Sequence, residues 1–106
     1  MTYDRALTAL ADPTRRLIYE RVRRQPHSVG ELTGFARISQ PAVSQHLRVL
    51  EAARLVRHRR EGTRRIYTAA PDGLAALKRY IESLWDDVLF AYAADDPRTA
   101  RRKNEG

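Results

Sequence analysis

Cysteine is absent from the 106-residue sequence, and so is any apolar run long enough to cross a membrane. The absence of cysteine excludes disulfides, thiolate metal ligands and cysteine nucleophiles. The first ten residues, MTYDRALTAL, also lack the regions that make up a secretory signal peptide. We therefore predict a cytoplasmic protein.

Acidic residues are few relative to basic ones, 13 Asp and Glu against 20 Lys and Arg, which gives a formal net charge of +7. A chain with this charge is expected to have an anionic partner. Arginine makes up 18 of the 20 basic residues, and skewed codon usage alone can produce that, so their placement is more informative than their number. The length and the balance of 42% hydrophobic and 31% charged residues predict one folded domain.

Groupings of catalytic residues are missing as well. The sequence has no recognisable Ser-His-Asp set, no paired carboxylates in an identifiable pocket and no glycine-rich phosphate loop. We expect the protein not to be an enzyme and to need no cofactor.

The segment 39–50, SQPAVSQHLRVL, is predicted to be a helix with an unusual outer face. Ser39 suits the N-cap, and a proline is tolerated in the first turn. At 100° per residue one stripe is apolar and contains Val43, Leu47 and Leu50. The opposite stripe contains Pro41, Ser44, Gln45 and Arg48. The last three supply a hydroxyl, an amide and a guanidinium group, and the stripe has no acidic residue. Such a face either contacts DNA bases and phosphates or is simply a polar face in solvent.

The residues before this segment predict shorter helices. Residues 3–11 form a short apolar-periodic segment, after which Asp12 and Pro13 begin a second helix with Leu17, Ile18 and Val22 facing inward. Ser28 and Glu31 fit a capping box that opens a brief third helix with Leu32 and Phe35 as its apolar contacts. A short capped helix, a tight turn and a helix with a polar outer face form a helix-turn-helix outline.

Two β-prone runs, 55–60 and 64–68, predict a hairpin around Glu61-Gly62-Thr63. Its expected inward residues are Val56, Ile66 and Tyr67. Five arginines lie on it, namely Arg57, Arg59, Arg60, Arg64 and Arg65. They could be a solvated edge that discourages aggregation. We favour a wing that follows DNA phosphates or enters a minor groove.

The last predicted helix runs from about residue 72 to 93 or 94 and carries more apolar surface than one stripe. Either it packs against a second copy of the chain, together with the first helix, or it covers its own core; we favour the dimer. The predicted dimer residues are Tyr3, Leu7, Leu10, Leu77, Ile81, Leu84, Trp85, Val88, Leu89 and Tyr92. Residues 95–106 are polar and unpatterned, and we expect a disordered basic tail that touches phosphates weakly.

Several motifs resemble the ArsR-type winged helix-turn-helix repressors. LADPTRR at residues 10–16 is similar to a signature of that family, and residues 31–32, 38–47 and 50–56 are similar to its helix-turn-helix core. Residues 60–65 with Tyr67 look like its wing. The resemblance implies a homodimer, formed by the first and last helices, that represses transcription by binding an imperfect inverted repeat in operator DNA.

The resulting prediction is a mainly helical fold with a small β-hairpin wing, in the order α-α-α-α-β-β-α over residues 1–94. The residues expected to bind DNA are Ser39, Gln40, Pro41, Ser44, Gln45, Arg48, Arg15, Arg16, Arg60, Arg64 and Arg65. Gln40, Ser44 and Gln45 are expected to reach base edges, and the arginines to contact phosphates. The alternative function is a winged-helix module that binds protein and not DNA.

The sequence departs from the family pattern in two ways. Arg37 and Arg54 stand where the family usually or often has glycine, so the turn at Arg37 is either shaped differently or slightly strained. The metal-sensing members' Cys-x-Cys motif is absent, the last helix has no histidine, and His27, His46 and His58 lie on separate predicted elements. We therefore expect no metal site and predict the non-metal-sensing subgroup, with its inducer left open.

Overall fold

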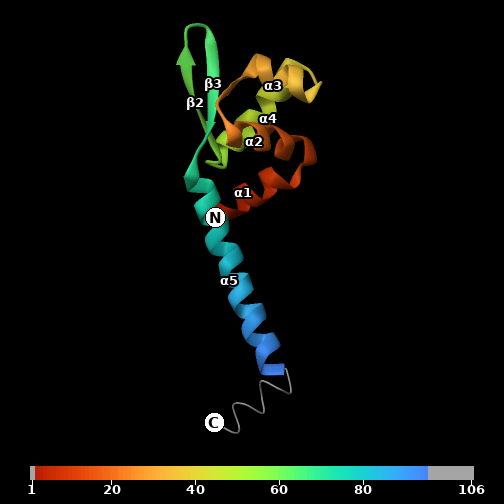
Figure 1. The fold of residues 1–106 in the computed structure, drawn as a ribbon, viewed down its shortest axis with the longest axis vertical. Helices are drawn as coiled ribbons and strands as arrows, with labels where there is room; N and C mark the ends of the chain where they lie inside the picture. The colour runs from red at the N-terminus through yellow and green to blue at the C-terminus, as the bar shows by residue number, and fades with distance from the viewer. Residues whose placement is uncertain (1, 96–106) are drawn as a thin grey trace.

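The structure is a computed structural model that describes residues 2–95. Four helices are followed by a hairpin and a long last helix (Figure 1), which confirms the predicted mainly helical fold with a β-hairpin wing. The elements are α1 (Thr2–Ala11), α2 (Pro13–Arg24), β1 (His27–Ser28), α3 (Val29–Ala36), α4 (Gln40–Ala52), β2 (Val56–Glu61), β3 (Arg64–Ala69) and α5 (Pro71–Asp95). The predicted basic tail lies outside the described residues, except for Asp95, which ends α5.

The sheet contains a strand that the sequence pattern does not reveal. Its order is β1-β3-β2, all antiparallel, with His27 opposite Tyr67 and Ser28 opposite Ile66. Two residues are too few to show the alternation that identifies a strand. Because β1 leads directly into α3, its pairing fixes the start of α3 against the middle of β3.

The predicted helix starts are confirmed by their capping hydrogen bonds. The backbone N–H of Arg15 donates to the carboxylate of Asp12 over 2.9 Å, and the N–H of Ala42 donates to the hydroxyl of Ser39 over 3.3 Å. Ser28 and Glu31 form the reciprocal capping box, with distances of 2.9 and 3.1 Å. These caps set where α2, α3 and α4 begin.

The two glycine replacements adopt the left-handed conformation. Arg37 has φ 58° and Arg54 has φ 59°. The Arg37 N–H still donates to the Thr33 carbonyl over 3.1 Å and closes α3. Hence the turn keeps a shape that glycine favours, and both arginines carry the associated steric strain.

The core lies where α1–α4 and the sheet meet. Its largest fully buried side chains include Ile18, Leu32, Leu47, Leu50 and Leu55. The hairpin's predicted inward residues, Val56, Ile66 and Tyr67, are all buried.

Two predicted core contacts are wrong. Leu17 is 57% exposed, because α2 turns Ile18, Tyr19 and Val22 inward instead. Phe35 is 37% exposed, and its ring is covered by the guanidinium of Arg21 at 3.9 Å from the ring centroid. Periodicity locates the apolar side of each helix but not the centre of its buried stripe.

Helix α5 packs on the domain only through its first turns and then extends away from it (Figure 1). Its buried residues are Gly73, Ala76 and Leu77, and the rings of Tyr3 and Tyr80 stack at 4.2 Å between α1 and α5. The alternative in which this helix covers its own core is therefore wrong for its second half. Leu77 is a correction to the predicted dimer surface, because at 6% exposure it belongs to the chain's own core.

Candidate nucleic-acid interface

The outer face of α4 is held toward solvent by a fully buried inner stripe. Val43, Leu47 and Leu50 are each 0% exposed, which fixes the rotation of the helix about its axis. Opposite them, the structure exposes Gln40, Pro41, Gln45 and Arg48 and leaves Ser44 half-buried. This face carries donors and acceptors for base edges and no carboxylate.

The hairpin presents its arginines to solvent. Arg57, Arg59, Arg60, Arg64 and Arg65 are all exposed, and Arg60 lies opposite Arg65 in the β2–β3 register. The turn between the strands contains Gly62 at φ 65°, a conformation that glycine adopts without strain. The concentration of positive charge on a short, exposed hairpin suits a polyanionic partner.

A groove joins these two surfaces. A cavity of about 340 Å³ lies between the start of α3, the outer face of α4 and the wing. It is lined by Ser28, Val29, Gly30, Gln40, Ser44, Thr63, Arg64 and Arg65. The structure thus brings together residues from two of the predicted DNA-binding groups, the α4 face and the wing.

Arg15 and Arg16, predicted to contact DNA, make hydrogen bonds to α1 within the chain. Arg15 donates through Nε to the Ala9 carbonyl over 2.8 Å, and Arg16 donates through Nη1 to the Leu10 carbonyl over 2.8 Å. These carbonyls belong to the last turn of α1, which has no intrahelical partners for them. The two arginines therefore cap α1, and Arg15 in addition lies 3.4 Å through Nη2 from the Thr8 carbonyl oxygen.

Arg15 also connects α1 to the predicted reading helix α4. Its Nη1 lies 3.3 Å from Nδ1 of His46. A guanidinium offers only donors, so Nδ1 of His46 accepts in this contact.

A second link that the sequence does not reveal joins α4 to the wing. His58 Nδ1 on β2 lies 2.7 Å from a carboxylate oxygen of Glu51 near the end of α4, and the His58 ring lies 5.2 Å from that of Tyr67. Histidine and glutamate seven residues apart across a turn give no recognisable pattern. The pair connects β2 of the wing to the end of α4.

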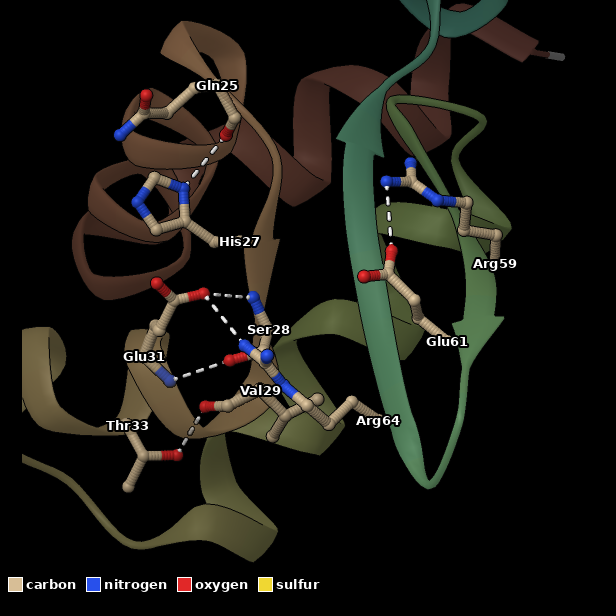
Figure 2. Close-up of polar contacts among 9 residues, drawn as sticks. All are labelled: Gln25, His27, Ser28, Val29, Glu31, Thr33, Arg59, Glu61 and Arg64. Carbon is tan, nitrogen blue, oxygen red and sulfur yellow. Dashed lines mark hydrogen bonds and ion pairs between the residues drawn. The ribbon is translucent and has the colours of Figure 1, made fainter.

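Glu31 connects α3 to the tip of the wing, as Figure 2 shows. Its Oε1 accepts from the Ser28 N–H at 2.9 Å and from Arg64 Nη2 at 3.5 Å. The backbone N–H of Ser28, with its hydroxyl, holds the pKa of Glu31 below its ordinary value, so the carboxylate is charged at neutral pH. Glu31 is an acid beside an otherwise basic groove.

The three histidines lie on different elements and contact different partners, so they do not form a metal site together. His27 donates through Nδ1 to the Gln25 carbonyl oxygen over 2.8 Å (Figure 2), while His46 and His58 have the partners described above. Among residues 2–95, no group of three or more His, Cys, Asp or Glu side chains is placed to hold a metal ion. Within the same range, no helix combines the length and the apolar character needed to cross a membrane.

Comparison with known proteins finds similarity to helix-turn-helix transcriptional regulators. A family model described as a helix-turn-helix domain matches residues 10–59. The HTH-type transcriptional regulator Rv2034 of Mycobacterium tuberculosis is 53% identical over 90 residues, which are 85% of this chain and 84% of that protein.

Solved structures agree with the sequence matches. An ArsR-like transcriptional regulator from Rhodococcus sp. RHA1 aligns with a TM-score of 0.72 and 29% identity, over 86% of this chain and 89% of that one. A winged helix-turn-helix DNA-binding domain from Mycobacterium bovis, described as homodimeric and as a possible ArsR-family regulator, aligns with a TM-score of 0.65 and 27% identity, over 81% and 80%.

Proposed function

Because the chain belongs to the ArsR family of helix-turn-helix transcriptional regulators, we propose that it is a homodimeric repressor that binds an imperfect inverted repeat in operator DNA. The observation that carries this proposal is the continuous surface formed by the acid-free face of α4, the groove and the arginines of the wing.

In this proposal α4 enters the major groove. Gln40, Ser44 and Gln45 reach base edges, and a glutamine amide can pair with adenine through two hydrogen bonds. Ser39 and Pro41 lie in the same turn, next to the DNA backbone. Arg48 is further along the exposed face and contacts phosphate.

The wing anchors the complex on the backbone. Arg60, Arg64 and Arg65 contact phosphates beside the groove that α4 occupies, and each contact adds to the salt dependence of binding. Replacing both Arg64 and Arg65 with alanine is expected to weaken binding to any duplex and to flatten the log-log salt slope by about 0.9 for each phosphate that the variant no longer neutralises. A slope that stays the same would remove the wing from the mechanism.

The dimer forms through the apolar face that one chain leaves uncovered. Ile81, Leu84, Trp85, Val88, Leu89 and Tyr92 on α5, with Leu7 on α1, are between 45% and 69% exposed. A continuous apolar face of this kind is typical of a subunit interface. Tyr3 and Leu10, which are half-buried, lie at its edge and fix α1 against α5 and the core.

Repression then follows from steric exclusion of the polymerase at the operator. A two-fold dimer places its reading helices about one helical turn of DNA apart, roughly 34–36 Å, or a multiple of this. We place the protein in the cytoplasm with the DNA. We also assign it to the non-metal-sensing subgroup, because its histidines are separated and engaged with other groups.

The test is to select duplex fragments bound by the full chain from a random or genomic pool and to measure its mass in solution. We expect an enriched inverted repeat whose half-sites recur at the helical period, and a dimer mass. Leu84→Glu, at an exposed position, is expected to give folded monomers that lose the inverted-repeat preference. A wild-type chain that is monomeric and is not retained by duplex DNA at low ionic strength contradicts the proposal. Salt-insensitive binding to a protein would then favour an interaction module.

A further inference from the structure

The ion pair between Glu31 and Arg64 lies at the edge of the groove described above. It joins residues 33 positions apart (Figure 2). Among residues 2–95 it is one of two described pairs that connect the wing to a helix, the other being His58 with Glu51. Arg64 lines the cavity, whereas none of the cavity's lining residues is acidic. Glu31, one position beyond Gly30 in the first turn of α3, supplies the negative charge from beside it.

Duplex geometry requires a DNA backbone to cross this groove if the proposed function is correct. The major and minor grooves of B-DNA are separated by the phosphates of one strand. A protein with α4 in the major groove and its wing along the neighbouring minor groove must hold that strand between the two elements. The cavity bounded by α4, the wing and the start of α3 is the space between them.

The polar groups in the cavity suit a phosphate. Arg64 and Arg65 supply guanidinium donors, Ser44 and Thr63 supply hydroxyls, and Gln40 supplies an amide. Arginine binds carboxylate and phosphate oxygens in the same way, through charge-assisted hydrogen bonds. Glu31 and a backbone phosphate can therefore accept from the same guanidinium donors of Arg64.

We propose, as an extension of the proposed function, that this cavity binds one backbone phosphate of the duplex and that Glu31 competes with that phosphate for Arg64. In the free protein Glu31 forms an ion pair with Arg64. On binding, Arg64 transfers from the carboxylate to the phosphate. Glu31 thus lowers the affinity of the protein for DNA of every sequence. Tight binding then depends more strongly on the contacts that α4 makes with bases.

The geometry of the pair supports an exchangeable contact. The two atoms are 3.5 Å apart, and the side chains are 58% and 55% exposed. Exposed pairs of this kind contribute little to stability. The Glu31 contact to the Ser28 N–H is shorter, at 2.9 Å, and does not involve Arg64. Glu31 can therefore keep its capping role after Arg64 leaves.

The test uses Glu31→Gln in the full chain. Glutamine is also accepted at this capping-box position, and its amide oxygen can still bond the Ser28 N–H. The matched control is Glu20→Gln, which removes the same charge from an i,i+3 pair with Arg23 (2.6 Å) on α2, away from the cavity. Affinities for a random-sequence duplex are measured by fluorescence anisotropy, with thermal melts to verify folding.

Glu31→Gln is expected to tighten binding by about three- to tenfold for the dimer, since loss of one weak ion pair in each of two protomers corresponds to this range. Glu20→Gln is expected to change the affinity for the duplex by less than about twofold, because a distant charge is largely screened. In the Arg64→Ala background the gain from Glu31→Gln is expected to fall below about twofold, because no shared partner remains.

Unchanged affinity for Glu31→Gln, or an equally large gain in the Arg64→Ala background, overturns the proposal while leaving the proposed function intact. A wild-type chain that binds no duplex overturns the proposed function itself. If Glu31→Gln does not fold, carboxyl-carbon NMR on the wild type decides the matter. The pKa of Glu31 should rise when DNA binds, and an unchanged value rejects the competition.

Discussion

Gly73→Ala tests how α5, the proposed dimer helix, is joined to the end of α4. Gly73 lies in the first turn of α5, and its N–H donates to the Arg54 carbonyl over 2.8 Å. A Cβ at this position would lie 2.1 Å from the Ala53 carbonyl oxygen and 2.9 Å from the Arg54 carbonyl carbon and oxygen. All of these are backbone atoms, so no side-chain rotation can relieve the clash.

The expected cost follows from the shift that relief requires. Ordinary contact begins near 3.4 Å, so the start of α5 must move by more than 1 Å, and its hydrogen bond to Arg54 weakens. Overpacking of a buried site costs about 1–3 kcal/mol and a weakened hydrogen bond about 1 kcal/mol. The better helix propensity of alanine returns up to about 1 kcal/mol. We therefore expect the free energy of unfolding to fall by about 1–4 kcal/mol.

The assay is urea unfolding of the full chain followed by circular dichroism, at one protein concentration because a dimer's stability depends on concentration. The matched control is Gly34→Ala in α3, where an added Cβ meets nothing within 4 Å. This control should gain about 0.5–1 kcal/mol. Equal effects of the two substitutions would refute the argument from close backbone approach.

Three further predictions concern base reading, the strained turn and acid stability. Gln45→Ala should weaken binding to the selected operator by about 1–3 kcal/mol and leave random duplex nearly unchanged, because an amide reads base edges; equal losses in anisotropy titrations would show that Gln45 reads no base. Arg37→Gly should raise the free energy of unfolding by about 1 kcal/mol, because φ 58° is strained for arginine; a lower urea midpoint contradicts this. The backbone N–H of Arg15 holds the pKa of Asp12 below its ordinary value, and that of Ser28 does the same for Glu31. Their stabilisation is present above the unfolded-state pKa values and is lost as the pH falls through the folded ones. Acid melts of Asp12→Asn with Glu31→Gln should accordingly show a smaller loss than the wild type.

Features that depend on a few consecutive residues are predictable from the sequence. The caps at Asp12, Ser28 and Ser39 each involve partners three residues away, and the hairpin depends on a short loop with Gly62. The buried stripe of α4 follows from helical periodicity alone. From these local signals the sequence predicts that α4 precedes the hairpin and which side of α4 is exposed, as the structure has them.

Features that depend on packing between distant elements are not predictable in this way. The anchoring of Arg15 and Arg16 on α1, and the link from Glu31 to Arg64, require knowledge of which helix ends and strand tips meet. Periodicity also defines an apolar arc that is wider than one neighbour can cover. It therefore cannot distinguish exposed Leu17 from buried Tyr19 on α2.

These contacts give α4 a fixed position relative to both elements of the proposed dimer surface. His46 in its middle meets Arg15, which is bonded to the last turn of α1, and the chain at its end meets Gly73 at the start of α5. A rearrangement of α1 against α5 therefore moves α4 directly, without passing through a flexible linker. In the proposed two-fold dimer the same displacement occurs twice and changes the separation of the two α4 helices. Because an inverted repeat would fix that separation, we expect a displacement at the α1–α5 surface to change the affinity for the proposed operator.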